Sequence, residues 1–141
     1  MKKILPLLLV LISIVVIHKK SAAATSTISA TTTDTVRKKI VHPKDAMTDG
    51  QVTDILNNMR QKRNDEEKVT ALKEGVKDKG IKIDQLIKLL NQFLTDDSKI
   101  ACAEYAFPYT VDYKAFLKIM DLFGTEGYKY KLEDFYDKNR K

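Results

Sequence analysis

The chain has 141 residues, with 25 Lys and Arg against 19 Asp and Glu, and its formal net charge is +6. This length is enough for one folded domain with its own core. The single cysteine, Cys102, excludes an intramolecular disulfide.

The N-terminal residues 1–24 have the pattern of a secretory signal peptide. Two lysines precede the uncharged run "ILPLLLVLISIVVI" at 4–17, and small residues follow it. The run is shorter than the ~20 apolar residues that cross a bilayer, so we expect no stable membrane span in the mature chain. We expect cleavage after Ala24 or Ala23 and export to the periplasm, the cell surface or the secreted space. The alternative is an uncleaved N-terminal anchor.

Most of the positive charge belongs to the predicted signal peptide. Residues 1–24 contain four lysines and no acid, so the formal charge falls from +6 to +2 without them. The remaining basic clusters, at 37–39 and 138–141, lie at the ends of the mature chain, where a solvated tail explains them. We therefore expect no nucleic-acid partner. A tail at 138–141 that binds an anionic polymer is a further possibility.

A flexible stalk is expected at residues 25–46. The stretch "TSTISATTTDT" at 25–35 is almost entirely Ser, Thr and Ala, which bury too little apolar surface to fold. Pro43 disfavours a helix in the segment that continues to the domain. The folded domain is expected at 47–141.

Three stretches share one amphipathic helical pattern. Apolar residues recur at i, i+3, i+4 and i+7 in 51–59, 85–93 and 115–123. Partner helices are expected at 65–76, 97–107 and 126–136. The spacings of 34 and 30 residues between copies are typical of repeats. The sequence therefore predicts an all-α fold of about six short helices, arranged as three stacked helix-turn-helix repeats.

A short joint recurs between the expected helices of a pair, as "FLTDDSK" at 93–99 and "FGTEGYK" at 123–129. In each copy we expect the Phe to close one helix into the core and the Thr to cap the next helix. The acids beside the Thr favour a helix N-terminus, so they have a structural explanation. We expect Lys99 and Lys129 to lie one turn in, on the outside.

Other start and stop signals agree with the helical reading. Capping boxes are expected to begin at Thr48 and Asn64. Gly80 is expected to end the second helix, and Pro108 the fourth.

The sequence offers no catalytic, cofactor-binding or metal-binding constellation. After signal removal the remaining histidine is His42, in the expected stalk, so a Ser-His or Cys-His pair would need a residue from outside the domain. Cys/His zinc spacing, calcium-loop and phosphate-loop patterns are absent. We expect Cys102 to be a buried, inert thiol, the alternatives being a mixed disulfide with a partner or a reactive thiol.

The aromatic residues are the most informative functional feature. All eleven lie from Phe93 onward, and "YAFPYTVDY" at 105–113 carries four of them. The candidate interaction patch, for a protein or glycan partner, consists of Tyr105, Tyr109, Asp112 and Tyr113. Core packing with hydroxyl groups at the surface is the alternative.

The stretch from 89 to 126 resembles the family called domain of unknown function 4476. The resemblance is carried by the joints at 93–99 and 123–129, the Ala-rich helix between them, the "YTVD" turn at 109–112 and the helix that ends in Leu-Phe. It covers residues 47–136, although the first joint is longer and lacks the Phe. The family implies a helical module attached to a low-complexity tail, as in exported Bacteroidetes proteins and animal proline- and serine-rich proteins. It implies no catalytic residues.

We therefore interpret the chain as a non-enzymatic protein-interaction module of the cell envelope or secreted space. The alternative is a hydrolase-like enzyme that uses carboxylates in a groove near Tyr109 and Asp112.

Overall fold

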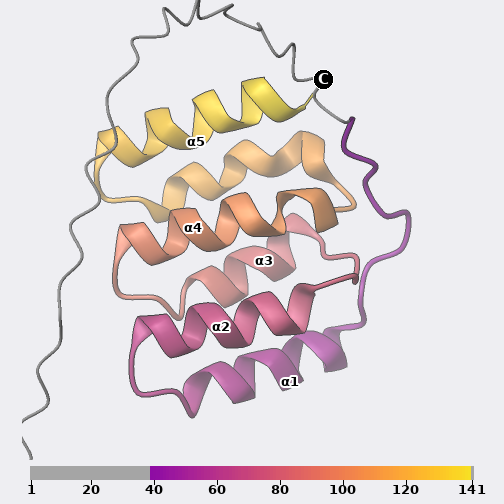
Figure 1. Cartoon of the computed structure of the whole chain (residues 1–141), viewed down its shortest axis with the longest axis vertical. Helices are drawn as coiled ribbons and strands as arrows, with labels where there is room; N and C mark the ends of the chain where they lie inside the picture. Colours follow the sequence, from indigo (N-terminus) through magenta and orange to yellow (C-terminus); the bar gives the residue numbers. More distant parts are fainter. Residues whose placement is uncertain (1–38, 141) are drawn as a thin grey trace, which may run out of the picture. The chain divides into compact units, whose positions relative to one another are not determined.

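The computed structural model describes residues 39–140, which form an all-α unit (Figure 1). The all-α class is thereby confirmed. The predicted signal peptide at 1–24 and the stalk up to residue 38 lie outside the described residues. Within 39–140, β-type pairing is confined to one isolated parallel bridge, between Ile81 and Thr110. The elements are α1 (Asp49–Arg60), α2 (Asp65–Val76), α3 (Ile83–Leu90), α4 (Asp96–Ala106), the 3₁₀ helices η1 (Phe107–Tyr109) and η2 (Tyr113–Leu122), and α5 (Glu126–Asn139).

The long helices pack in two rows. Helices α1, α3 and η2 contact one another in that order, and α2, α4 and α5 do the same in a second row (Figure 1). The rows are joined because α1 contacts α2, α3 contacts α4, and η2 contacts α5. That the three pairs are copies of one repeated unit stays a prediction.

The helix starts follow the expected caps to different degrees. Thr48 forms a full capping box, in which its Oγ1 accepts from the Gln51 amide at 3.3 Å and Gln51 Oε1 accepts from the Thr48 amide at 2.9 Å. Asn64 accepts from the Glu67 amide at 2.9 Å, but the Glu67 carboxylate accepts from the amide of Arg63, so that box is incomplete. Thr95 caps α4 by accepting from the Ser98 amide, whereas Thr125 makes no side-chain cap bond.

The third amphipathic stretch forms a helix of a different type from the one its pattern predicts. We expected an α-helix at 115–123, but η2 is a 3₁₀ helix of ten residues, longer than the usual run of three or four. A 3₁₀ helix has three residues per turn, so Tyr113, Phe116, Ile119 and Leu122 fall in one line. Phe116 and Ile119 are fully buried in that line.

Gly80 is not the end of the second helix. Helix α2 ends at Val76, and the turn that follows places Asp78 at a positive φ of 59°. A Cβ on Gly80 would lie 1.8 Å from the carbonyl oxygen of Asp45. Gly80 is therefore required by the close approach of another segment and not by a helix C-cap. Pro108 behaves as expected, since α4 ends at Ala106.

The close neighbour of Gly80 is the segment 39–47, which we call the strap. Ile40 packs against the core, Met47 is buried, and the Met47 amide donates to the Gly80 carbonyl at 2.7 Å. Gln85, buried in α3, donates to the Met47 carbonyl at 3.1 Å. Residues 39–46 were expected to continue the flexible stalk, but the structure places them against the helices.

The lysine of the joint faces inward, which corrects the expectation of an outward Lys99. Its Nζ donates to the Leu122 carbonyl at 3.1 Å and pairs with Asp96, and the side chain is only 15% exposed. Lys68, at the equivalent position of α2, donates to the Gln92 carbonyl at 2.8 Å. Each lysine thus ties the start of one second-row helix to the end of the next first-row helix.

Asp65 strengthens the first of these ties. Its Oδ2 accepts from the amides of Leu94 and Thr95 at 3.0 Å and from the Thr95 hydroxyl at 3.1 Å. Partial burial raises the pKa of the Asp65 carboxyl, but these hydrogen bonds outweigh it and hold the pKa below its ordinary value. The joint motif is therefore a structural clamp between neighbouring pairs.

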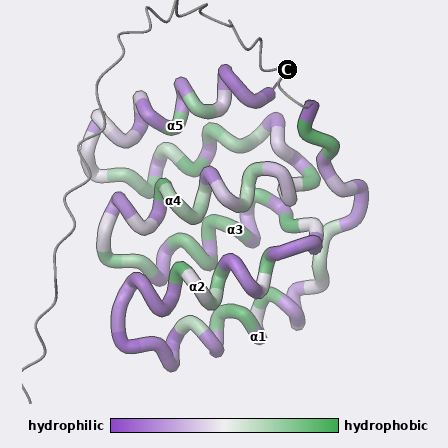
Figure 2. The backbone as a smooth tube through the Cα atoms, in the orientation of Figure 1, coloured by the Kyte–Doolittle hydropathy of each residue, from purple (hydrophilic) through white to green (hydrophobic). Residues whose placement is uncertain are grey.

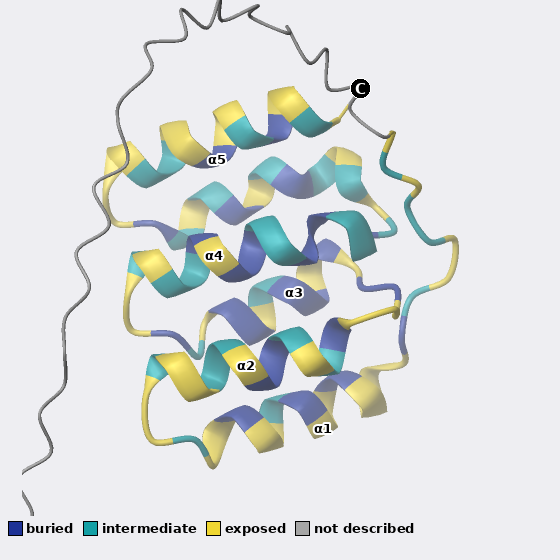
Figure 3. Cartoon of the chain, viewed as in Figure 1, coloured by how far each residue is buried: buried dark blue, intermediate teal, exposed yellow. Residues whose placement is uncertain are grey.

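The last helix carries a polar outer face. With the joint lysines aligned, Leu72 and Val76 of α2, both fully buried, correspond to Glu133 and Asp137 of α5, both exposed. Figure 2 shows α5 as much more hydrophilic than α3, and Figure 3 shows exposed residues along the outer side of α5. A polar face of this kind offers little apolar surface for a further helix to cover.

The core lies between the two rows and contains one free cysteine, Cys102, which is buried as expected. Burial raises the pKa of its thiol to about 12, because a thiolate would lose its hydration there. No helix among residues 39–140 is both long enough and apolar enough to cross a bilayer.

Candidate functional site

The predicted aromatic patch lies where α4 gives way to η1 and η2, at the end of the unit that carries the strap. Pro108 ends α4, and Thr110 closes the turn because its hydroxyl donates to the Phe107 carbonyl at 2.7 Å. Phe107 itself is buried and makes edge-to-face contacts with Phe116 at 4.8 Å and Phe135 at 5.5 Å between ring centroids. These contacts fix the position of the side chains that flank it.

The structure brings Tyr105 and Tyr109 together. Their ring centroids are 5.7 Å apart, and both residues are partly exposed. The ammonium of Lys73 lies 5.2 Å from the centroid of the Tyr105 ring, a cation–π contact. Partial burial, a hydrogen bond with Tyr109 and the nearby charge of Asp78 raise the pKa of Tyr105. The Tyr105 phenol therefore stays neutral near pH 7.

Tyr113 does not join that pair, because the strap covers one face of its ring. The His42 ring stacks on Tyr113 with centroids 4.0 Å apart and an interplanar angle of 8°. His42 Nδ1 lies 3.0 Å from the Thr110 carbonyl oxygen, and since a carbonyl only accepts, Nδ1 is the protonated donor. Burial lowers the pKa of His42, although hydrogen bonds to backbone carbonyls partly oppose this.

Asp112, the fourth residue of the predicted patch, has a structural role. Its Oδ1 accepts from the amide of Ile83 at 2.8 Å, at the first residue of α3. A carboxylate at a helix N-terminus satisfies a free amide and complements the helix dipole. The predicted set of four therefore divides into a surface pair, a covered ring and a capping acid.

A hollow of about 410 Å³ lies beside Tyr109, between the strap and the turn after α4. Its lining is mainly apolar and aromatic, with one carboxylate and one ammonium: Val41, His42, Pro43, Asp78, Lys79, Pro108 and Tyr109. Val41 is 87% exposed, which is unusual for a large aliphatic side chain. Of these lining residues, only Tyr109 belongs to the interaction patch predicted from the sequence. A signal for the rest existed in the apolar pair Ile40–Val41 before Pro43, within an otherwise polar segment.

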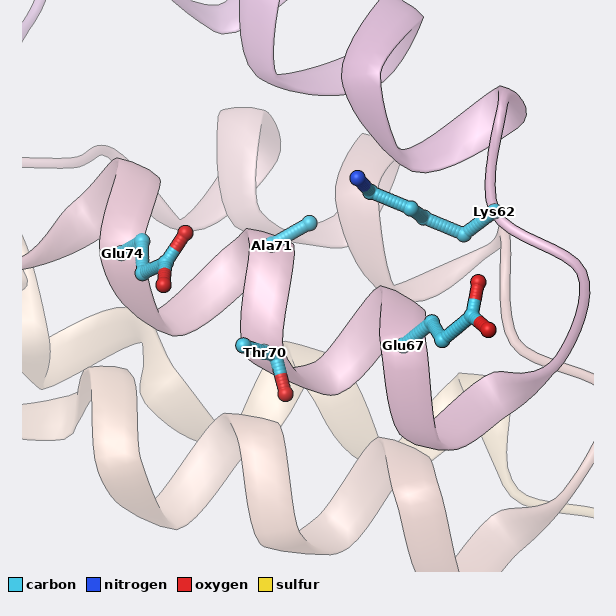
Figure 4. Close-up of a pocket in the computed structure, with 5 residues that line it drawn as sticks. All are labelled: Lys62, Glu67, Thr70, Ala71 and Glu74. Carbon is cyan, nitrogen blue, oxygen red and sulfur yellow. The ribbon is translucent and has the colours of Figure 1, made fainter.

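The enzyme alternative requires two carboxylates that face one hollow near Tyr109. Asp78 is the only carboxylate in the lining of that hollow, and Asp112 is bound to the backbone of α3. A second hollow of about 220 Å³ lies over α2, lined by Lys62, Glu67, Thr70, Ala71 and Glu74. Figure 4 shows the carboxylates of Glu67 and Glu74 at opposite ends of this hollow, with Thr70 and Ala71 between them. The first hollow is therefore lined by a single carboxylate, and the second has its two carboxylates at opposite ends.

Metal ligation has no assembled site in the part of the chain that the structure describes. Across 39–140, no three His, Cys, Asp or Glu side chains are grouped so that they could hold a metal ion.

The chain was compared with protein families, with curated proteins and with solved structures. A family model described as Domain of unknown function (DUF4476) matches residues 46–136. Neither the curated proteins nor the solved structures gave a match. The family match covers the five α-helices almost completely and starts within the strap.

Proposed function

We propose that the chain, which belongs to the family described as Domain of unknown function (DUF4476), is a non-enzymatic module that binds a segment of a partner protein in the cell envelope or secreted space. The observation that carries the proposal is the hollow beside Tyr109. The hollow combines the exposed Val41 side chain with rigid aromatic and proline rings.

The composition of the hollow is what a protein ligand requires. Tyr supplies a large contact area at low entropy cost, and pockets of roughly 300–1,000 Å³ with mainly apolar walls and few polar groups are typical of binding sites. Pro43, Pro108 and the Tyr109 ring present flat apolar surfaces. An extended, proline-containing segment fits such aromatic-lined surfaces because it loses little entropy on binding.

The charged groups of the hollow would fix the orientation of a bound ligand. Asp78 and Lys79 are neighbours in the turn after α2 and carry opposite charges, so they favour a ligand with a donor and an acceptor at matching positions. The Tyr105 hydroxyl lies next to that of Tyr109 and extends the polar edge. The charged and hydroxyl groups at the edge of the hollow therefore supply specificity, and the aromatic and proline rings supply contact area.

Export is part of the same proposal. It is supported by the basic start, the uncharged run at 4–17 and the small residues after it. Mass spectrometry of the protein from its native cells tests this directly. A mature N-terminus at residue 24 or 25 is expected, and an intact Met1 in a cytoplasmic fraction would contradict export.

The binding proposal is tested with a random peptide library displayed on phage and selected on the purified protein. We expect enriched peptides, and we expect Tyr109→Ala to weaken their binding at least about tenfold, or ~1.4 kcal/mol, because a central aromatic contact is lost. Tyr130→Ala is the matched control, since Tyr130 is 68% exposed on α5, away from the hollow. Fluorescence anisotropy with labelled peptides gives the dissociation constants.

Two results would contradict the binding proposal. One is the absence of any enriched peptide together with binding of the protein to a glycan array, which would move the ligand to another chemical class. The other is a set of selected peptides whose affinity falls equally in Tyr109→Ala and Tyr130→Ala, because the hollow would then have no special part in binding.

A further inference from the structure

Asp78, in the wall of the hollow beside Tyr109, has a backbone conformation that most side chains disfavour. Among residues 39–140 it is the only non-glycine residue with a positive φ, which is 59°. Glycine avoids this strain, and asparagine tolerates it as well as aspartate does. The turn after α2 therefore does not need a carboxylate at this position. Residues in such conformations concentrate at binding and active sites.

The Asp78 carboxylate has no charged partner in the part of the chain that the structure describes. The ion pairs among residues 39–140 include neither Asp78 nor Lys79. Other carboxylates have structural tasks, since Asp112 caps α3 and Asp65 holds two backbone amides just before α4. Asp78 is exposed at the edge of the hollow, where a ligand can reach its carboxylate.

The turn fixes the backbone on both sides of Asp78. The Lys79 amide donates to the Val76 carbonyl at 3.0 Å, and the Gly80 carbonyl accepts from the Met47 amide at 2.7 Å. Val76 and Gly80 are both buried. Because an aspartate side chain is short, its carboxylate has few positions available once the backbone is fixed. The exposed Lys79 side chain is long and flexible, so its ammonium can turn toward solvent.

Two tyrosine rings lie near Asp78, and the faces of such rings attract positive charge. Tyr109 lines the same hollow, and its ring centroid is 5.7 Å from that of Tyr105. Tyr105 is also close to Asp78, because the Asp78 charge adds to the effects of partial burial and of Tyr109 that raise the Tyr105 pKa. The Tyr105 ring already holds one cation, the Lys73 ammonium, 5.2 Å from its centroid. The rings and the carboxylate therefore favour the same sign of ligand charge.

We propose that the partner segment bound in the hollow carries a basic side chain, Arg or Lys, which pairs with the Asp78 carboxylate beside the Tyr109 ring. This inference rests on the proposed function and names the chemistry that its ligand must present. Arg fits best, because a planar guanidinium can bind a carboxylate through two hydrogen bonds and can also stack on an aromatic ring.

The lysines near the hollow do not reverse this preference. Lys79 lines the hollow, Lys73 lies at the Tyr105 ring, and Lys77 follows the last residue of α2. The exposed ammonium groups of Lys77 and Lys79 can move away from a bound cation into water, where their repulsion is screened. A carboxylate in direct contact keeps its attraction. An acidic ligand would gain Lys79 but would face the Asp78 carboxylate and the negative faces of the rings.

Peptide selection measures this preference directly. The phage library of the binding test is selected in parallel on the full-length wild type, on Asp78→Asn and on Asp54→Asn. Asn is accepted at a positive φ, so Asp78→Asn removes the charge and keeps the turn. Asp54, exposed in α1 and outside the hollow, is the matched control for the loss of one negative charge. We expect Lys or Arg to be enriched at one peptide position with the wild type and with Asp54→Asn, but not with Asp78→Asn.

Fluorescence anisotropy with the peptides selected on the wild type measures the strength of the pair. We expect Asp78→Asn to weaken their binding at least about threefold, and Lys79→Gln to tighten it because a repulsive charge is removed. A peptide whose basic residue is replaced by Gln should bind the wild type more weakly by a similar factor. That peptide should lose little more in Asp78→Asn, because the two changes remove the same contact.

Two results would overturn this inference and leave the proposed function standing. One is that the selected peptides lose affinity in Tyr109→Ala but bind Asp78→Asn as tightly as Asp54→Asn. The other is enrichment of acidic residues in peptides that Lys79→Gln weakens, which would assign an anionic partner segment. The absence of any enriched peptide, or equal effects of Tyr109→Ala and Tyr130→Ala, would overturn the proposed function and this inference together.

Discussion

The close approach of Gly80 to the strap makes Gly80→Ala the most direct test of the packing at this end of the molecule. A Cβ at this position would lie 1.8 Å from Asp45 O, 2.9 Å from Asp45 C and 3.0 Å from a methyl group of Val111. Because two of these neighbours are backbone atoms, no side-chain rotation relieves the clash. The strap has to move away from the α2–α3 link.

The cost of that movement can be worked from the contacts. Loss of the hydrogen bond from Met47 to Gly80 costs about 1 kcal/mol, and exposure of the Met47 side chain, now 7% exposed, costs about 1.5–3 kcal/mol. We therefore expect Gly80→Ala to lower the free energy of unfolding by about 3 kcal/mol.

Urea unfolding at pH 7.5, followed by circular dichroism at 222 nm, measures this difference. Gly127→Ala is the matched control, because no atom lies within 4 Å of a Cβ there. A helical Gly→Ala change with free space leaves stability equal or higher by up to about 1 kcal/mol. A free energy of unfolding for Gly80→Ala within about 0.5 kcal/mol of the wild-type value would contradict this packing. The strap would then not lie against Gly80, and it would not form a wall of the hollow.

Two further predictions concern the joint and the core. Lys99→Met should lower the free energy of unfolding by about 1.5–3 kcal/mol in the same assay, because it removes a charge-assisted hydrogen bond to the Leu122 carbonyl. Lys129→Met, at the last joint, is the control and should leave the free energy of unfolding unchanged. Equal effects of the two substitutions would contradict the structural clamp. With a pKa of about 12, only about one Cys102 side chain in 10⁴ is a thiolate at pH 8. Iodoacetamide should therefore label Cys102 slowly in the native protein and rapidly in urea. Equal labelling rates would contradict the burial of Cys102.

The joint motif shows how a sequence repeat can acquire a physical meaning only in three dimensions. The sequence placed a Phe, a Thr and a Lys at fixed spacing, and the helix and cap roles of the first two follow from local rules. The carbonyl that Lys99 reaches lies 23 residues further along the chain. That contact depends on how the next helix pair packs, which local sequence rules cannot show. Those rules therefore predicted that Lys99 would lie on the outside.

The aromatic cluster shows the same limit at the candidate site. Its position near the end of α4 followed from Pro108, and its content of Tyr suggested a surface. Which ring stays open was decided by His42, which reaches Thr110 across 68 residues of sequence and covers Tyr113. The sequence had placed His42 in a stalk because Pro43 disfavours a helix in that segment.

The helices, their order and most of their start signals were determined by the sequence alone, because amphipathic periodicity, capping residues and proline act over a few residues. The tertiary structure decided the 3₁₀ form of η2, the inward turn of Lys99, the need for Gly80, and the strap that completes the hollow. Each of these depends on a contact between segments far apart in the chain. Such contacts are selected by the fit of surfaces that exist only after the helices have packed.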